Sequence, residues 1–209
     1  GRLITSGPEE AKAWVPDGPL DQGRFVSTDG PERLAFRIQG GQAASFRTAE
    51  NSQTFERTAF WRRPDVLAAL TGLTALAAIA TLFGLFLRSR RELRQNATQA
   101  RAAWIQNIQA GLWLAAIALF GVWAAGATNL QAIMYRWPGP LLITASAAAL
   151  VAAALTLVTI AALPAVWQGG RRVDSWSVAR KVFFTITVLI YAAFSVVLAM
   201  TGALEPWSR

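Results

Sequence analysis

The chain has 209 residues, of which 54% are hydrophobic, and a formal charge of +8 at neutral pH. This composition is typical of membrane proteins and excludes a disordered chain. It contains no Cys and no His, so disulfides, thiol chemistry, the usual general base and the commonest metal ligand are excluded. We therefore expect no metal site and no cofactor.

The charge is unevenly distributed along the chain. Residues 1–65 carry nine basic and nine acidic side chains, whereas residues 66–209 carry eleven basic and three acidic ones. Most of this excess lies in two short segments between apolar runs, which is typical of cytoplasmic membrane loops rather than of a nucleic-acid-binding face. We expect a lipid bilayer, and no nucleic acid, among the partners.

The first domain, residues 1–61, is predicted to be a short antiparallel β segment. Residues 34–38 and 44–48 alternate apolar and polar side chains around Gly40-Gly41, which predicts a β-hairpin. Further strands are expected around Phe25 and in residues 52–60, so that the sheet has three or four strands.

A sheet of this size buries little apolar surface, and we expect it to be the end of a larger upstream domain. The chain starts at Gly1 without a Met, and no signal peptide precedes the β segment. Both features fit a chain whose N-terminus continues a longer protein.

The second domain, residues 62–209, contains four apolar runs, each near or above the ~20 residues that cross the hydrocarbon core of a bilayer. We predict membrane spans at about residues 66–87, 105–127, 140–166 and 182–204. Tryptophans at their ends suit the headgroup level of a membrane: Trp61, Trp104, Trp137, Trp167 and Trp207. The predicted fold is an α+β membrane protein, a short antiparallel β segment followed by a four-helix transmembrane bundle.

The basic residues between the spans predict the orientation. Arg136 is the only basic residue in the loop after the second span, whereas the loops after the first and third spans are rich in Arg and Lys. Those residues are Arg88, Arg90, Arg91, Arg94 and Arg101, and Arg171, Arg172, Arg180 and Lys181. The positive-inside rule places these two loops in the cytoplasm. Both termini and the β segment then lie on the periplasmic side of a bacterial inner membrane.

No span carries a charged residue in its middle, which argues against a pump, channel or transporter. Ser and Thr hydroxyls in the first, third and fourth spans are expected to bond to backbone carbonyls or across helices. Gly111 with Ala115, and Gly121 with Ala125, recur at four-residue spacing. We expect these small residues to let helix backbones pack closely.

No catalytic motif occurs in the chain. Ser-x-x-Lys, Gly-x-Ser-x-Gly, a Walker loop and a His-based triad are all missing from the sequence. Ser177 and Lys181 are four residues apart, but we expect Lys181 to anchor the helix at the membrane surface. The Glu9-Glu10 pair and Lys12 are expected to be solvated. We therefore assign no catalytic, cofactor-binding or metal-binding residue.

The stretch GRFVSTDGPERLAFRIQGGQAASFRTAENSQTFERTAFWRRPDV, residues 23–66, resembles the tail of bacterial β-lactamase-related serine hydrolases of the class C or penicillin-binding type, often called CubicO-like. In that family the hydrolase domain can be followed by a small β region with spaced aromatic and Gly positions, a Phe-Glu-Arg-like step and a Trp, and then by membrane helices. The matching positions here are Phe25, Phe36, Gly41, Phe55, Glu56, Arg57 and Trp61. The ending, residues 170–207, is also similar to the last helix of membrane-anchored members.

The resemblance implies that the nucleophilic Ser, its Lys and the assisting Tyr lie upstream, because no position of this chain matches them. On this interpretation the chain is the membrane-anchoring C-terminal region of a periplasm-facing serine hydrolase acting on peptidoglycan, peptide or ester substrates. Its partner would be the upstream catalytic domain. The alternative left open is a non-catalytic accessory subunit of a larger inner-membrane complex, packed against partner transmembrane helices. A transporter ranks third.

Overall fold

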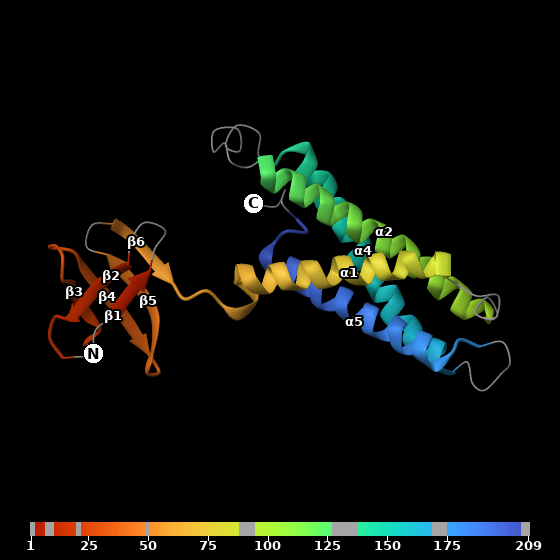
Figure 1. The fold of residues 1–209 in the computed structure, drawn as a ribbon, viewed down its shortest axis with the longest axis horizontal. Coiled ribbons are helices and arrows are strands. Elements are labelled where there is room, and N and C mark those ends of the chain that lie inside the picture. The colour runs from red at the N-terminus through yellow and green to blue at the C-terminus, as the bar shows by residue number, and fades with distance from the viewer. Residues whose placement is uncertain are drawn as a thin grey trace. The chain divides into compact units, whose positions relative to one another are not determined.

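The computed structural model of the chain describes residues 3–6, 11–19, 22–48, 51–87, 95–126, 138–168 and 175–205. The chain divides into two compact units, Gly1–Ala59 and Phe60–Arg209. The first contains strands and the second contains helices (Figure 1).

The first unit is an antiparallel sheet whose strands follow one another in sequence order. Its described strands are β1 (Leu3–Ser6), β2 (Ala11–Pro16), β3 (Arg24–Ser27), β4 (Arg33–Gln39), β5 (Gln42–Thr48) and β6 (Asn51–Glu56). Strands β3 to β6 coincide with the four that the sequence predicts. The prediction of only three or four strands is wrong, because β1 and β2 extend the same sheet.

The hairpin between β4 and β5 turns at the two glycines that the sequence singled out. Gly40 and Gly41 both have positive φ, 58° and 77°, and Gln39 and Gln42 pair on either side of them. Two consecutive residues with positive φ are what a two-residue type I′ turn requires, and glycine adopts this conformation without steric cost. The predicted hairpin is confirmed.

The sheet unit has a small core. Trp14 and Leu34 are each 3% exposed, and they are the buried large apolar residues among the described part of this unit. The Trp14 indole Nε1 donates a hydrogen bond to Thr5 Oγ1 at 2.8 Å, which ties β2 to β1. Two large buried side chains give a sheet of this length little hydrophobic stabilisation.

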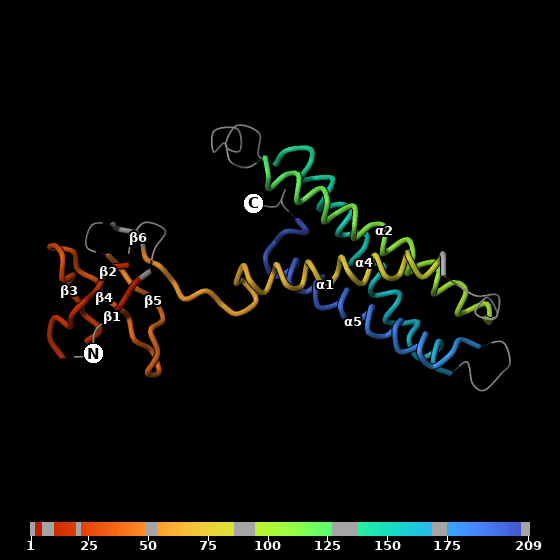
Figure 2. The backbone as a smooth tube through the Cα atoms, in the orientation of Figure 1, coloured from red at the N-terminus to blue at the C-terminus, as the bar shows by residue number. Residues whose placement is uncertain are grey.

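The second unit contains four long helices after a 3₁₀ turn, η2 (Phe60–Arg62). They are α1 (Pro64–Leu87), α2 (Ala97–Gly126), α4 (Pro140–Gln168) and α5 (Val178–Thr201). Each is long and apolar enough to cross a bilayer, so the described chain fits a multi-pass membrane protein. The chain runs along α1, returns along α2, and repeats this with α4 and α5 (Figure 2).

Each helix packs against two neighbours: α1 against α2 and α5, and α4 against the same two helices. Alanines at these contacts, such as Ala78, Ala110 and Ala149, are fully buried. The larger cluster of buried residues also contains an aromatic group, in which the Trp113 ring lies 5.1 Å from that of Phe194 and 6.1 Å from that of Tyr191. Small residues therefore bring the helices close, as is usual in membrane bundles.

The small residues that make these contacts are not the predicted ones. Gly111, Ala115, Gly121 and Ala125 lie on an exposed side of α2, and a Cβ added at Gly111 or Gly121 would meet nothing within 4 Å. The prediction that these four residues pack against other helices of this chain is therefore wrong. Spacing alone does not say which side of an apolar helix faces its neighbours.

The helix ends are set by local capping. Helix α2 starts at Ala97, well before the predicted span, because Asn96 Oδ1 accepts the Gln99 N–H at 2.7 Å. Ser177 caps the start of α5 in the same way, and Gly202, with φ of 73°, ends it. Of the Trp residues expected at the membrane surface, Trp61, Trp104 and Trp167 are exposed, and Trp137 and Trp207 lie outside the described residues.

Candidate functional site

Two of the residues weighed for chemistry in the sequence, Ser177 and Lys12, make structural contacts in the described part of the chain. Ser177 Oγ accepts the Arg180 N–H at 3.3 Å as the cap of α5. Lys181 is only 7% exposed, so the expectation of a surface anchor is wrong for this side chain. Lys12 Nζ forms an ion pair with Glu32 at 2.6 Å, rather than being simply solvated. Glu9 and Glu10 lie outside the described residues.

The polar groups that organise the bundle are glutamines of α2, which the sequence analysis did not single out. Gln99 is fully buried. Its Nε2 donates to Val166 O at 3.3 Å and to Ser175 Oγ at 3.2 Å, and its Oε1 accepts the Trp176 N–H at 3.1 Å. This one side chain therefore joins the end of α4 and the approach to α5 to the first turn of α2.

Gln109 makes a second polar link, between α2 and α4. Its Nε2 donates to Thr156 Oγ1 at 2.5 Å and to Ala152 O at 3.3 Å. Its Oε1, the Trp113 Nε1 and the Thr74 Oγ1 are buried and have no hydrogen-bond partner among the described groups. Buried polar atoms without partners are costly in a bundle that excludes water.

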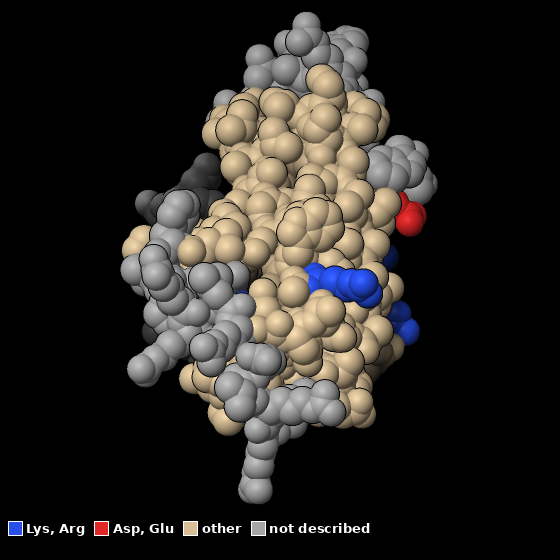
Figure 3. Space-filling view, turned by 90° about the vertical axis from the view of Figure 1, so that its right-hand side faces the viewer, with Lys and Arg blue, Asp and Glu red and all other residues tan. Residues whose placement is uncertain are grey.

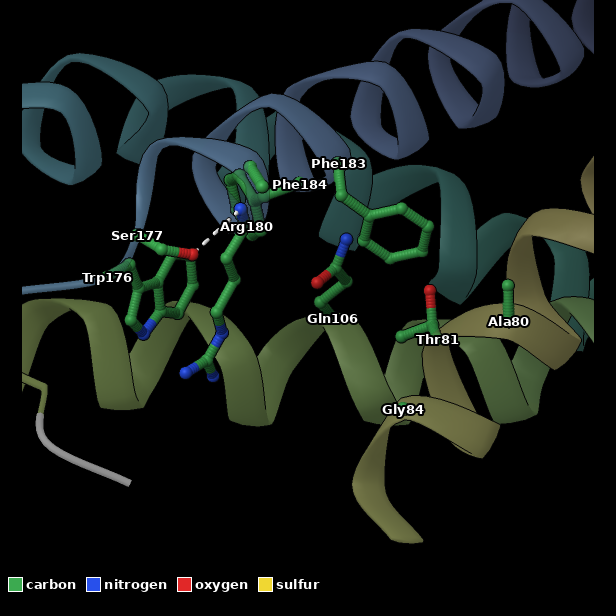
Figure 4. A pocket seen from close by; sticks show the side chains of 10 residues that line it. Ala80, Thr81, Gly84, Gln106, Trp176, Ser177, Arg180, Phe183 and Phe184 are labelled. Carbon is green, nitrogen blue, oxygen red and sulfur yellow. Dashed lines mark hydrogen bonds between the residues drawn. The ribbon is translucent and has the colours of Figure 1, made fainter. Parts of the chain in front are cut away.

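A cavity of about 260 Å³ lies at the end of the bundle where α1 ends and α5 begins. Its lining comes from α1, α2, the segment before α5, and α5 itself. The residues are Ala80, Thr81, Gly84, Gln106, Trp176, Ser177, Ala179, Arg180, Phe183 and Phe184. Figure 4 shows Gln106 rising from α2 between Arg180 on one side and Thr81 on the other.

Gln106 is another buried glutamine of α2, and its side chain is among those that line this cavity (Figure 4). The side chain is 5% exposed, and its Nε2 has no hydrogen-bond partner among the described residues. Gln99 and Gln109 both use their amide nitrogens within the protein. Gln106 is therefore distinguished by an amide donor that the described protein leaves unused.

Arg180 supplies the charge of the cavity and is held in place. Its guanidinium carbon lies 4.2 Å above the centre of the Trp176 ring, and its Nη2 donates to Gln95 Oε1 at 3.2 Å. The Trp176 Nε1 donates to the same Gln95 oxygen at 2.8 Å. A cation stacked on an indole is preorganised, and the planar fork of a guanidinium matches the geometry of carboxylates and phosphates.

The chemistry of this cavity suits binding rather than catalysis. Its polar lining residues include Gln106, Arg180 and Thr81, and Ser177 caps the positively polarised first turn of α5. None of its lining residues is acidic or a nucleophile paired with a base. Across the described part of the chain no group of three or more potential metal ligands occurs.

Sequence reasoning missed this site because the glutamines carry no charge and stand at the edge of an apolar run. Gln99, Gln106 and Gln109 fall on the same buried side of α2. That helical spacing was available in the sequence, and amides on one face of a membrane helix are a signal of polar contacts. Comparison of the chain with family models, curated proteins and solved structures finds no match.

Proposed function

We propose that the chain is the membrane-anchoring C-terminal region of a serine hydrolase of the β-lactamase or penicillin-binding type. The catalytic domain would precede the sheet, and the helices would hold it against the periplasmic face of a bacterial inner membrane. The resemblance of residues 23–66 to that family supports this assignment. The described helices, which are apolar outside and carry no nucleophile–base pair in the cavity, suit an anchor.

The observation that carries the proposal is a row of phenylalanines across the sheet. Neighbouring rings are 5.6 Å apart for Phe25 and Phe36, 5.6 Å for Phe36 and Phe46, and 4.8 Å for Phe46 and Phe55. Phe55, on the last strand, is 43% exposed. A shallow hollow of about 350 Å³ lies beside Phe36, Phe46 and Phe55.

This row is the surface on which we place the upstream catalytic domain. The described part of the sheet unit buries few large apolar residues of its own. Covering a row of aromatic rings that ends in an exposed ring removes apolar surface from water, which favours association with a second surface. Three members of the row, Phe25, Phe36 and Phe55, are among the positions that carry the resemblance. Covering them with the hydrolase domain would give the sheet the core it lacks.

The orientation follows from the basic residues of the two inner loops. Arg101 and Arg180 are the described arginines near the starts of α2 and α5, the helix ends that adjoin these two loops. With these ends in the cytoplasm, the start of α1 and the sheet before it are periplasmic. The substrates would be peptidoglycan, peptides or esters reached from the periplasm.

The test compares the 209-residue chain with the same chain extended by its upstream sequence. Under the proposal, a fluorophosphonate or penicillin probe labels the extended protein at one upstream Ser of a Ser-x-x-Lys motif, and Ser→Ala abolishes the labelling. The 209-residue chain remains unlabelled. Labelling of this chain at one of its own Ser residues, or an unreactive extended protein, would refute the hydrolase assignment.

A second candidate is a non-catalytic accessory subunit of a larger inner-membrane complex. The observation that favours it is the exposed small-residue side of α2, where Gly111, Ala115, Gly121 and Ala125 leave room for another helix. Gly and Ala at four-residue spacing permit close helix–helix approach in membranes. Cross-linking in membranes through Cys at Ala115 distinguishes the two: a specific heterologous product favours the subunit, and its absence favours the anchor.

A further inference from the structure

The polar face of the sheet carries four exposed arginines on three adjacent strands. They are Arg24 of β3, Arg33 and Arg37 of β4, and Arg47 of β5. Side chains alternate between the two faces along a strand, so the buried Leu34 and the ring of Phe36 lie on the other face of β4. Ala35 pairs with Arg24 on one side and with Arg47 on the other. The arginines of all three strands therefore share one face.

Three of these arginines line a hollow of about 480 Å³ on this face: Arg24, Arg37 and Arg47. The hollow arises because short side chains, those of Ala35 and Ser45, lie between the long ones in the cross-strand pairs. Apart from Ala35 and Phe36 its lining is polar, and no lining residue is acidic. The volume is within the range of about 300–1,000 Å³ that is usual for ligand sites.

No carboxylate of the described chain neutralises these three arginines. Asp17, whose N–H donates to Arg24 O at 2.9 Å, and Glu56 of β6 border the face. Neither lines the hollow, and neither forms an ion pair with an arginine within the described residues. Arg47 Nε donates to Thr54 Oγ1 at 2.7 Å, which holds the guanidinium without reducing its charge. Like charges gathered on neighbouring strands repel one another, so an anion in the hollow is favoured.

The positive charge is local to the hollow rather than a property of the whole sheet unit. Residues 1–59 carry seven basic and eight acidic side chains, so the unit has no basic excess that would attract every anion. In the view of Figure 3, the helical unit shows a few basic side chains that stand apart on a described surface that is otherwise mostly uncharged. We therefore expect a ligand of the hollow to be held by short-range contacts with the three guanidinium groups.

We propose that this hollow binds the phosphate group of a soluble ligand. The arginines come from three strands, so they reach a ligand from different directions. A tetrahedral phosphate accepts hydrogen bonds from several directions, whereas a carboxylate accepts them mainly in one plane. Ser45 and Thr54 also line the hollow and add hydroxyl groups. The mostly polar lining offers little surface for acyl chains, which favours a soluble ligand over a lipid. The site is independent of the hydrolase assignment and of the orientation of the chain in a membrane.

The experiment follows the modification of individual arginines by phenylglyoxal in the complete 209-residue chain in detergent, by mass spectrometry of its peptides. Inorganic diphosphate is the soluble probe. We expect saturating diphosphate to slow the modification of Arg24, Arg37 and Arg47 at least about fivefold. Arg33 lies on the same face outside the hollow, and its modification should slow less than about twofold. Equal protection of Arg33 would mean general attraction of the anion and would overturn the site.

Arg37→Gln and Arg33→Gln are a matched pair, because both remove an exposed arginine from the same face of β4 and only Arg37 lines the hollow. Arg37→Gln should raise the diphosphate concentration that half-protects Arg24 and Arg47 about tenfold or more, because hydrogen bonds to a charged group are lost. Arg33→Gln should change this concentration by less than about twofold. Equal effects of the two substitutions would refute the role of the hollow.

Ala35→Leu tests the hollow without removing a charge. A leucine at this exposed position fills part of the hollow and should raise the half-protecting diphosphate concentration about fivefold or more. Chymotrypsin should cleave the sheet of this variant as slowly as that of the parent, which separates binding from folding. Unchanged protection in Ala35→Leu would show that the arginines bind the anion outside the hollow and would overturn the proposal.

Two further probes test the chemistry and the source of the ligand. Citrate, which carries several carboxylates, should protect the three arginines at least about fivefold less well than diphosphate at the same concentration. Equal protection by citrate would overturn the preference for phosphate. Phosphatidylglycerol added to the detergent micelles should leave the protection by diphosphate unchanged. Displacement of diphosphate by this lipid would overturn the soluble source of the phosphate group.

Discussion

Substitution of Gln99 is the strongest test of which contacts hold the helical bundle together. We predict that Gln99→Met, which keeps the length of the side chain but removes its polar atoms, destabilises the helical unit. The substitution removes three hydrogen bonds and leaves the Trp176 N–H and the Val166 carbonyl without these contacts in a fully buried place. Because Met and Gln side chains have similar volumes, the loss of the hydrogen bonds dominates the change in the free energy of unfolding.

The magnitude follows from the geometry of the three bonds. The two bonds donated by Nε2 are long, 3.3 and 3.2 Å, and each is assigned about 0.6 kcal/mol, the average for membrane helices. The bond from the Trp176 N–H adds about 1 kcal/mol, because its loss leaves a buried donor unpaired. The sum is about 2 kcal/mol, or roughly a 30-fold change in the folding equilibrium.

The assay is unfolding of the detergent-solubilised protein by increasing fractions of sodium dodecyl sulfate, followed by far-ultraviolet circular dichroism. Arg101→Met, an exposed substitution on the same part of α2, is the control and should stay within about 0.5 kcal/mol of the parent. If Gln99→Met unfolds at the same detergent fraction as the parent, the inference that this side chain joins α2, α4 and the approach to α5 is refuted.

Two further predictions concern the sheet and the separation of the units. Gly23→Ala should speed tryptic cleavage of the sheet several-fold, because Gly23 has φ of +61° and a Cβ there would lie 2.8 Å from Phe36 O. Gly30→Ala is the control and should not change the cleavage rate, because a Cβ there would meet nothing within 4 Å. Equal cleavage rates for the two variants would contradict this prediction. Residues 60–209 expressed alone should insert into membranes and remain helical. Residues 1–59 alone should show no cooperative unfolding, because Trp14 and Leu34 are the large buried apolar residues in the described part of this unit. A cooperative unfolding transition of residues 1–59 would show that the sheet needs no covering domain.

Features encoded locally could be predicted from the sequence. The Gly40-Gly41 turn and the flanking alternation predict the β4–β5 hairpin, and the uncharged stretch between Asp65 and Arg88 predicts α1. Strand β1 could not be predicted, because four residues are too few for a period of two to be distinctive. Its pairing with β2 depends on the Trp14 indole reaching Thr5, a contact that no local pattern reports.

The candidate site depends on contacts between residues distant in sequence, and this is why the sequence did not reveal it. Gln99 meets Val166 and Trp176 only once four helices are packed, and Gln106 reaches the cavity only because α5 starts beside it. Nothing in the spacing of Gly111 and Ala115 says that they face outward. Membrane helices are apolar all round, so hydrophobic periodicity, which orients helices in soluble proteins, is weak here.

Cysteine accessibility in intact spheroplasts tests the central claim most directly, because the chain has no Cys of its own. Gly30→Cys places a thiol on an exposed turn of the sheet, and Thr98→Cys places one on the exposed first turn of α2. A chain that holds its sheet in the periplasm predicts that a membrane-impermeant maleimide labels position 30 in intact spheroplasts and position 98 only after lysis. Labelling of position 98 in intact spheroplasts, with position 30 protected, would contradict the orientation and the proposed periplasmic anchor.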